Sequence, residues 1–336
     1  MPYDARACLA AALVAVASPA GADGMLSDFA YPHPVKEHAL TSQGQDLVMA
    51  YMDVAPSPAA NGKTAVLFHG KNFCGATWEG AIAPLASAGY RVVVPDQVGF
   101  CKSTKPVTYQ MSFHQLAANT HALLESLGVE KPILIGHSMG GMVATRYALS
   151  FPEDTGALVL VNPIGLEDWS AKGVPPRTID QLLQGERKTT AASIKAYQQK
   201  VYFGGNWRPE YDRWVDMLAS MYQGDDSDLA MLSQARASDM VFSQPVVHEF
   251  PRISVPTVLI IGERDTTAIG RDRAPPEIAE TLGNYPVLAR EAEQRIPGSR
   301  LIAFPDLGHS PQVEDPKRFN ATLLDALAAL PSKSLP

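Results

Sequence analysis

A serine lies in a glycine-flanked turn between an apolar run and a helical pattern. The segment GHSMG occupies residues 136–140, directly after the apolar run 133–135 and before a helical pattern over 139–151. A serine on a sharp strand-to-helix turn is the arrangement of a nucleophile elbow. Glycines are needed there because the turn is strained and the flanking backbones crowd each other. The pattern therefore predicts Ser138 as a nucleophile.

A serine hydroxyl needs a base to take its proton and a carboxylate to orient that base. His309 follows the last apolar run, 301–304, and Asp265 follows the apolar run 257–261. The chain order serine, aspartate, histidine is the one expected when the serine lies on such a turn. We therefore predict a triad of Ser138, Asp265 and His309. Other carboxylates that could fill the acid position are Glu263, Asp272, Glu167 and Asp168.

Acyl transfer also needs two backbone N–H groups that bind the developing oxyanion. One comes from the residue after the nucleophile, Met139, and the other from the loop after the third strand, where Lys71 follows the apolar run 64–68. The side chains of Lys71 and Asn72 face either the substrate or solvent, and the sequence leaves both readings open.

Apolar runs alternate with helical patterns along most of the chain. Strands are predicted at 35–41, 45–54, 64–68, 91–94, 133–135, 157–161, 257–261 and 301–304, and helices at 76–88, 112–127 and 139–151. This alternation indicates an α/β fold built on a mostly parallel sheet. Active sites of such sheets lie at the carboxyl ends of the strands, where the predicted triad also falls.

The alternation stops between residues 163 and 252. Helices are predicted there at 189–203, 208–223 and 228–240, which suggests an insertion over the sheet. Apolar side chains form one helical face in the second of these helices. They are either the core of the insertion or part of the roof of a substrate pocket, and they comprise Trp207, Tyr211, Trp214, Leu218 and Met221.

Composition and charge exclude several classes of protein. The 336 residues are 46% hydrophobic and 19% charged, which is not the composition of a disordered chain. The net charge is -7 and basic runs are absent from the sequence, so we expect no binding to nucleic acid. The cysteines are Cys8, Cys74 and Cys101, and their spacing does not fit a zinc site, so no metal is predicted.

The N-terminus has the pattern of a secretory signal peptide. A positive end at residues 1–6 precedes an apolar run over 7–17 and a small-residue cleavage site at 20–22. The apolar run is too short to span a bilayer, which takes about 20 residues, so no stable membrane anchor is expected. We predict a signal peptide at residues 1–22 and an exported, periplasmic or secreted protein. The alternative is an apolar helix that is retained in the fold.

These residues resemble the α/β-hydrolase superfamily, in particular its capped, carboxylesterase-like serine hydrolases. The likeness covers about residues 35–330 and rests on His-Gly at 69–70, the segment from Asp96 to Ser103, GHSMG at 136–140 and Gly-His at 308–309. It implies an eight-stranded, mostly parallel sheet flanked by helices, with a helical cap after the sixth strand. The implied division is a catalytic domain at 23–162 and 253–336 and a cap at 163–252.

Two departures from the family pattern concern the site. Cys101 stands where the family often has glycine, and the segment 268–298 is longer than usual, so it could cover the mouth of the pocket. The resemblance places the third and fourth strands side by side, which brings together the loops that carry Cys74 and Cys101. We therefore expect a disulfide between them, in keeping with export. Two buried free thiols are the alternative.

The function expected from these residues is hydrolysis of a small carboxylic ester or similar acyl compound, without a cofactor. The same residues could act on the carbon–carbon bond of a ring-cleavage product, on a lactone or an amide, or in perhydrolysis. A non-hydrolytic ligand-binding member of the fold is a further alternative. The sequence does not indicate an oligomeric state.

Overall fold

The computed structural model describes residues 24–57 and 59–331. The predicted signal peptide, residues 1–22, lies outside these residues. The described part of the chain forms an α/β-hydrolase fold with one eight-stranded sheet in the order β1-β2-β4-β3-β5-β6-β7-β8. Its strands are β1 (Val35–Ser42), β2 (Gln45–Val54), β3 (Thr64–Phe68), β4 (Arg91–Pro95), β5 (Ile133–His137), β6 (Ala157–Val161), β7 (Thr257–Gly262) and β8 (Arg300–Phe304).

The sheet is parallel from β4 to β8, and β2 runs antiparallel to both of its neighbours, β1 and β4. The central strands are buried on both faces, which explains why they are continuous apolar runs in the sequence. In β5, Leu134 belongs to the core on one face, whereas Ile133 and Ile135 belong to the core on the other. This alternation is the two-residue period of a strand.

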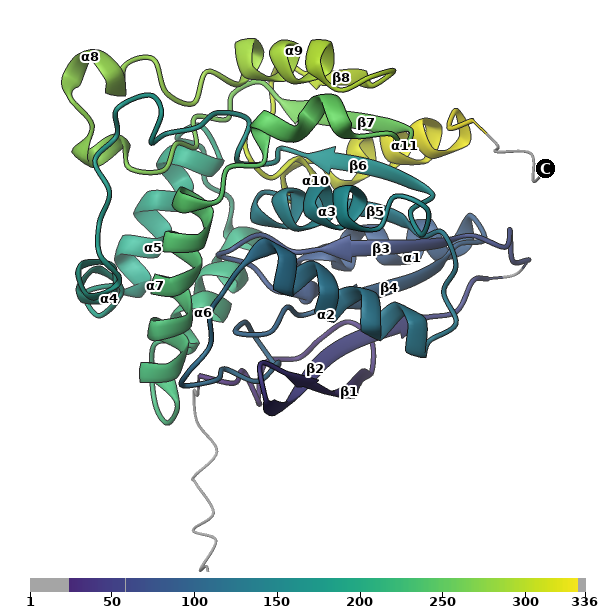
Figure 1. Cartoon of the computed structure of the whole chain (residues 1–336), viewed down its shortest axis with the longest axis horizontal. Coiled ribbons are helices and arrows are strands. Elements are labelled where there is room, and N and C mark those ends of the chain that lie inside the picture. Colours follow the sequence, from purple (N-terminus) through teal and green to yellow (C-terminus); the bar gives the residue numbers. More distant parts are fainter. Residues whose placement is uncertain (1–23, 58, 332–336) are drawn as a thin grey trace, which may run out of the picture.

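Helices cover both faces of the sheet (Figure 1). One face carries α1 (Glu79–Ser87) and α11 (Pro316–Ala328), whose buried side chains share a core with β3, β4 and β5. The other face carries α2 (Phe113–Ser126), α3 (Met139–Ser150) and α9 (Tyr285–Arg295). The short helices α8 (Pro276–Ala279) and α10 (Pro311–Glu314) lie in loops. Among the described helices, none is long and apolar enough to cross a bilayer.

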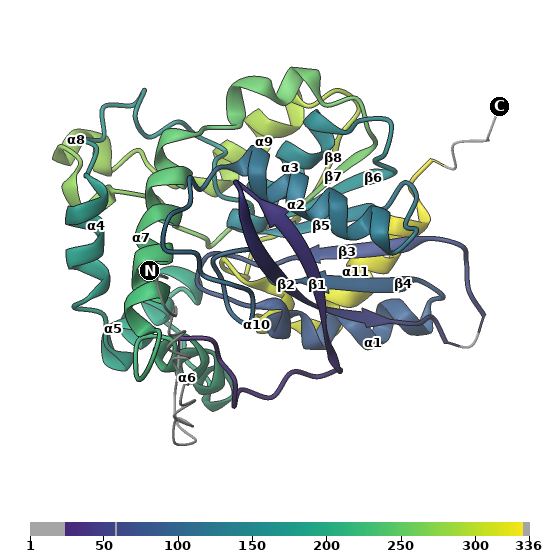
Figure 2. The same cartoon turned by 60° about the horizontal axis from the view of Figure 1, so that its bottom comes forward.

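The stretch 163–252 is helical, and its four α-helices gather at one end of the sheet in both views (Figures 1 and 2). They are α4 (Ile179–Glu186), α5 (Ala191–Tyr197), α6 (Asp212–Ser220) and α7 (Ser227–Ser243). The π-helical turn η2 (Gln198–Tyr202) directly continues α5. Buried residues of α6 and α7 belong to the same core cluster as one face of the sheet. The division of the chain into 23–162 plus 253–336 and a cap at 163–252 stays a prediction.

Candidate active site

Ser138 lies on a strained turn between β5 and α3. Its backbone has φ 56° and ψ -123°, a conformation that residues with a Cβ rarely adopt. Two glycines make the turn possible, because a Cβ on Gly136 would lie 2.4 Å from the carbonyl oxygen of Gly140, and one on Gly140 would lie 2.4 Å from that of Phe68. The turn presents the hydroxyl at the carboxyl end of the sheet, with Ser138 only 5% exposed.

The structure brings Ser138, His309 and Asp265 into one hydrogen-bonded chain. The Ser138 hydroxyl donates to Nε2 of His309 at 2.9 Å, and Nδ1–H of His309 donates to Oδ2 of Asp265 at 2.6 Å. His309 and Asp265 are both fully buried in loops that follow β8 and β7. In this geometry the imidazole can accept the serine proton while the carboxylate holds the ring in one tautomer.

The other carboxylates considered for the acid position are engaged elsewhere. Each pairs with a basic side chain rather than with His309. The pairs are Glu263 with Arg290, Asp272 with Arg177, Glu167 with Lys172 and Asp168 with His248. Of these five carboxylates, Asp265 is the one that accepts a hydrogen bond from His309.

Two residues that the sequence analysis did not single out fix the Asp265 carboxylate. The Asn162 side chain donates to Oδ2 of Asp265 at 3.0 Å and also exchanges hydrogen bonds with the backbone of Gly262. The Thr267 backbone N–H donates to Oδ1 of Asp265 at 2.8 Å. Asn162 has φ 36°, and asparagine tolerates this left-handed region better than most residues. An asparagine directly after the predicted strand 157–161 was the sequence signal that could have indicated this residue.

His309 is held from two sides. Nε2–H of His137 donates to the His309 carbonyl oxygen at 2.8 Å, and burial lowers the pKa of His137 well below its ordinary value, so this ring stays neutral. On the other side, the His309 N–H donates to the carbonyl oxygen of Tyr202 at 2.8 Å, and the two rings stack with centroids 4.4 Å apart. Tyr202 ends η2, and π-helical turns are frequent at functional sites.

The predicted oxyanion donors lie beside Ser138. Within residues 24–57 and 59–331, the backbone N–H groups of Lys71 and Met139 have no hydrogen-bond partner. Gly70 lets the loop after β3 approach closely, since a Cβ there would lie 3.0 Å from Cβ of Ser138. His69 anchors this loop: its Nδ1–H donates to the Gly70 carbonyl oxygen, and its Nε2 accepts the N–H of Gln97. Burial lowers the pKa of His69, in keeping with a neutral ring that both donates and accepts.

A disulfide joins Cys74 to Cys101, as expected from the resemblance. The two Cα atoms are 5.8 Å apart and both residues are fully buried. The bond ties the loop after β3 to the loop after β4, and the Asp96 carboxylate strengthens this link by accepting the N–H groups of Gly75 and Lys102. Cys101 has φ 52°, the left-handed conformation that glycine adopts without strain.

One trio of possible metal ligands lies close together in the described chain, namely His69, Asp96 and Cys101. Two of its ligand atoms are already engaged. Cys101 is in the disulfide, and Nε2 of His69 accepts the N–H of Gln97. This trio does not have the free donor atoms that a metal site needs.

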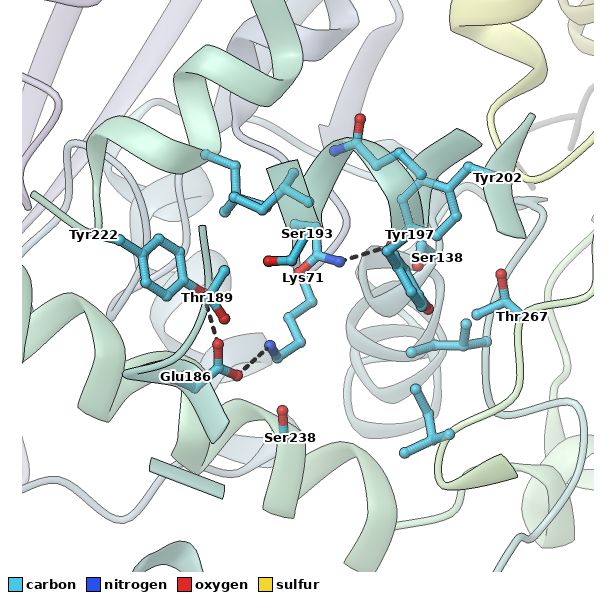
Figure 3. Close-up of a pocket in the computed structure, with 16 residues that line it drawn as sticks. Lys71, Ser138, Glu186, Thr189, Ser193, Tyr197, Tyr202, Tyr222, Ser238 and Thr267 are labelled. Carbon is cyan, nitrogen blue, oxygen red and sulfur yellow. Dashed lines mark hydrogen bonds and ion pairs between the residues drawn. The ribbon is translucent and has the colours of Figure 1, made fainter. Parts of the chain in front are cut away.

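A cavity of about 310 Å³ opens over Ser138 (Figure 3). Leu218 is the one member of the predicted aromatic and apolar stripe that lines it. Tyr211, Trp214 and Met221 are buried in the core, and the half-buried Trp207 packs against that core. Ile269 is the one residue of segment 268–298 that lines it. Within this segment, α9 instead packs beside β7 and β8. The cavity volume is at the lower end for ligand pockets, which suits a small substrate.

The chain matches the model of the α/β-hydrolase fold family over residues 64–316. It therefore belongs to that family. A solved structure described as a probable hydrolytic enzyme from Pseudomonas aeruginosa PAO1 is 56% identical, with a TM-score of 0.90, and the match covers 91% of this chain and 98% of that one.

Two curated relatives are more distant. A putative carbamate hydrolase from Escherichia coli O111:H- is 25% identical over 83% of this chain and 96% of its own length. A 2-hydroxy-6-oxononadienedioate/2-hydroxy-6-oxononatrienedioate hydrolase from Comamonas testosteroni is 26% identical over 80% of this chain and 89% of its own length. The chain is therefore a hydrolase of the α/β family.

Proposed function

We propose that this protein is a serine hydrolase that cleaves a carboxylic ester through an acyl-enzyme intermediate. The observation that carries the proposal is the buried hydrogen-bonded chain from Ser138 through His309 to Asp265. Hydrogen bonds of this kind between a hydroxyl, an imidazole and a carboxylate activate a serine for attack on a carbonyl carbon.

In the proposed reaction, Ser138 Oγ attacks the ester carbonyl carbon while His309 Nε2 takes its proton. The N–H groups of Lys71 and Met139 stabilise the tetrahedral oxyanion. When this intermediate collapses, the bond to the alcohol breaks and His309 returns the proton to the leaving oxygen. A water molecule, deprotonated by His309, then attacks the acyl-enzyme carbonyl and releases the acid and the free serine.

Hydrolysis of short p-nitrophenyl esters tests this proposal. Ser138→Ala should lower kcat by at least about 10⁴-fold, and Asp265→Asn should lower it by a similar factor because the imidazole takes the wrong tautomer. Ser150→Ala is the matched control, since Ser150 is an exposed residue at the end of the same helix, α3. A fluorophosphonate probe should label the wild type at Ser138. An unlabelled protein would favour a ligand-binding member of the fold and overturn the proposal.

A second candidate is hydrolysis of a carbon–carbon bond in a ring-cleavage product. It is favoured by the relative from Comamonas testosteroni, whose name gives 2-hydroxy-6-oxononadienedioate and 2-hydroxy-6-oxononatrienedioate as the compounds that it hydrolyses. Lactone hydrolysis and perhydrolysis could use the same residues. An ester panel assayed beside a vinylogous diketone and a lactone separates these activities, because the preferred substrate has the highest kcat/KM.

We also propose that the protein is exported after removal of residues 1–22. Two observations support export, namely the signal-peptide pattern and the Cys74–Cys101 disulfide, which is typical of oxidising compartments. N-terminal sequencing of the protein from its natural host tests this proposal. A mature chain that starts near Asp23 is expected, and one that starts at Met1 would refute export.

A further inference from the structure

The cavity over Ser138 has a strongly polar region away from the predicted triad. There the Lys71 ammonium lies 3.1 Å from Oε1 of Glu186, and the Tyr222 hydroxyl donates to Oε2 of Glu186 at 2.7 Å. Figure 3 shows this group on the side of the cavity opposite Thr267, with Ser238 and Thr189 beside it. Lys71 belongs to the loop after β3, whereas Glu186 ends α4, so the pair joins the sheet to the helical stretch.

This ion pair contributes little to the stability of the fold. The side chains of Lys71 and Glu186 are only 17% and 15% exposed, so both charges lose much of their hydration. That loss offsets most of the attraction between them. An ion pair placed in the same cavity as the nucleophile is better explained by recognition of a ligand.

Several hydrogen-bond donors at this site are left free for a ligand. Each carboxylate oxygen of Glu186 already accepts one hydrogen bond. Burial and the Glu186 charge raise the pKa of Tyr222 well above its ordinary value, so its hydroxyl keeps its proton and continues to donate. An ammonium group carries three donors, and Lys71 uses one of them within the described residues. The hydroxyls of Ser238 and Thr189 add two more possible donors beside it.

We propose that this site binds a carboxylate on the substrate, so that the enzyme prefers small esters that carry a second, free carboxylate. A carboxylate has four lone-pair positions and would accept from Lys71 and the neighbouring hydroxyls. An apolar end would leave the remaining lysine donors without a partner. The Lys71 backbone N–H faces the ester oxygen in the proposed reaction, so one residue would contact both ends of a short substrate. This inference rests on the proposed ester hydrolysis.

A series of methyl esters with one chain length tests the preference. Monomethyl adipate ends in a carboxylate, methyl hexanoate in a methyl group and methyl 6-aminohexanoate in an ammonium. We expect the wild type to have a kcat/KM for monomethyl adipate at least tenfold above that for either of the others. Lys71→Met should reduce the adipate-to-hexanoate ratio at least tenfold, and Lys71→Arg should keep most of it. Glu186→Gln should raise the ratio, because it removes the carboxylate that competes for Lys71.

The matched control is Lys188→Met, which removes an exposed positive charge from the segment just after α4 and should leave the ratio unchanged. A wild type that prefers methyl hexanoate or methyl 6-aminohexanoate would overturn the inference but not the proposed ester hydrolysis. So would an adipate-to-hexanoate ratio that Lys71→Met does not change. Failure to hydrolyse any ester, together with no fluorophosphonate labelling of Ser138, would instead overturn the proposed function and this inference with it.

If Ser138 is labelled but none of these esters is turned over, the labelling rate itself is the readout. Monomethyl adipate should then slow labelling of the wild type more strongly than methyl hexanoate does, and this difference should vanish in Lys71→Met. Equal protection by the two esters would refute the carboxylate site. A folded Lys71→Met variant is recognised by an unchanged circular dichroism spectrum, and Glu186→Gln tests the same site if that variant does not fold.

Discussion

Removing the Cys74–Cys101 disulfide should have two separable effects on stability. The bond closes a loop with a sequence separation of 27, for which the chain-entropy relation gives about 3.5 kcal/mol at 25 °C. Cys101 also has φ 52°, where a residue with a Cβ costs about 1 kcal/mol that glycine avoids. Cys74→Ala/Cys101→Ala should therefore lower the free energy of unfolding by about 3.5 kcal/mol. Cys74→Ala/Cys101→Gly should be about 1 kcal/mol more stable than the double alanine variant.

Guanidinium chloride unfolding without reducing agent, followed by circular dichroism, measures both differences. The two variants share the change at Cys74, so the difference between them reports the backbone conformation at position 101 alone. A double alanine variant within about 1 kcal/mol of the wild type would show that the cross-link does not stabilise the fold through loop closure. A glycine variant less stable than the alanine variant would refute the argument from the left-handed backbone.

Three further predictions concern the surroundings of the site. Burial raises the pKa of Glu314 to about 7, above its ordinary 4.5, so the folded state retains a proton that the unfolded chain loses. As the pH rises from about 4.5 to 7, the free energy of unfolding of the wild type should therefore fall by up to about 3 kcal/mol relative to that of Glu314→Gln, with no further change above pH 7. A difference between the urea midpoints of the two proteins that is the same at every pH would contradict this. Asn162→Ala removes a buried hydrogen-bond donor from Asp265. It should lower kcat on p-nitrophenyl acetate roughly tenfold and the free energy of unfolding by about 2 kcal/mol. Unchanged values for both would refute the role of Asn162 in positioning Asp265. Gly140→Ala should destabilise the fold by about 3 kcal/mol, because the new Cβ would lie 2.4 Å from a backbone oxygen of β3. Gly185 has open space around it, so Gly185→Ala should be neutral or slightly stabilising. Thermal unfolding measures both variants.

The sheet could be predicted from the sequence because its strands are buried on both faces. Each predicted strand matches an observed one to within two residues, for example 133–135 against β5 (Ile133–His137). Helix α4 was not predicted, because it is short and its apolar residues, Ile179, Leu182 and Leu183, are too few to mark a helix clearly; none of its residues is fully buried. Its capping box, in which Thr178 and Gln181 bond each other's backbone, was the local signal that could have located it.

The three residues of the candidate triad were predictable because each lies in the turn or loop that follows a strand of recognisable pattern. Their supporting residues were not, because Asn162 and Tyr202 approach Asp265 and His309 only in the folded chain. A sequence pattern specifies which strand end a residue follows. It does not specify which loop from elsewhere packs against that residue, since this depends on side-chain contacts between distant segments.

The contact between Tyr202 and His309 limits how the helical stretch 163–252 can move. The Tyr202 carbonyl oxygen accepts the His309 N–H, and its ring stacks on the imidazole. The Tyr202 hydroxyl in turn accepts a hydrogen bond at 2.9 Å from Asn72, which follows Lys71 in the loop after β3. Displacing η2 would therefore remove support from His309 and from the loop of Lys71 at once. Because proton transfer in the proposed reaction requires His309 to keep its geometry, we expect the stretch to hold η2 in place during that reaction.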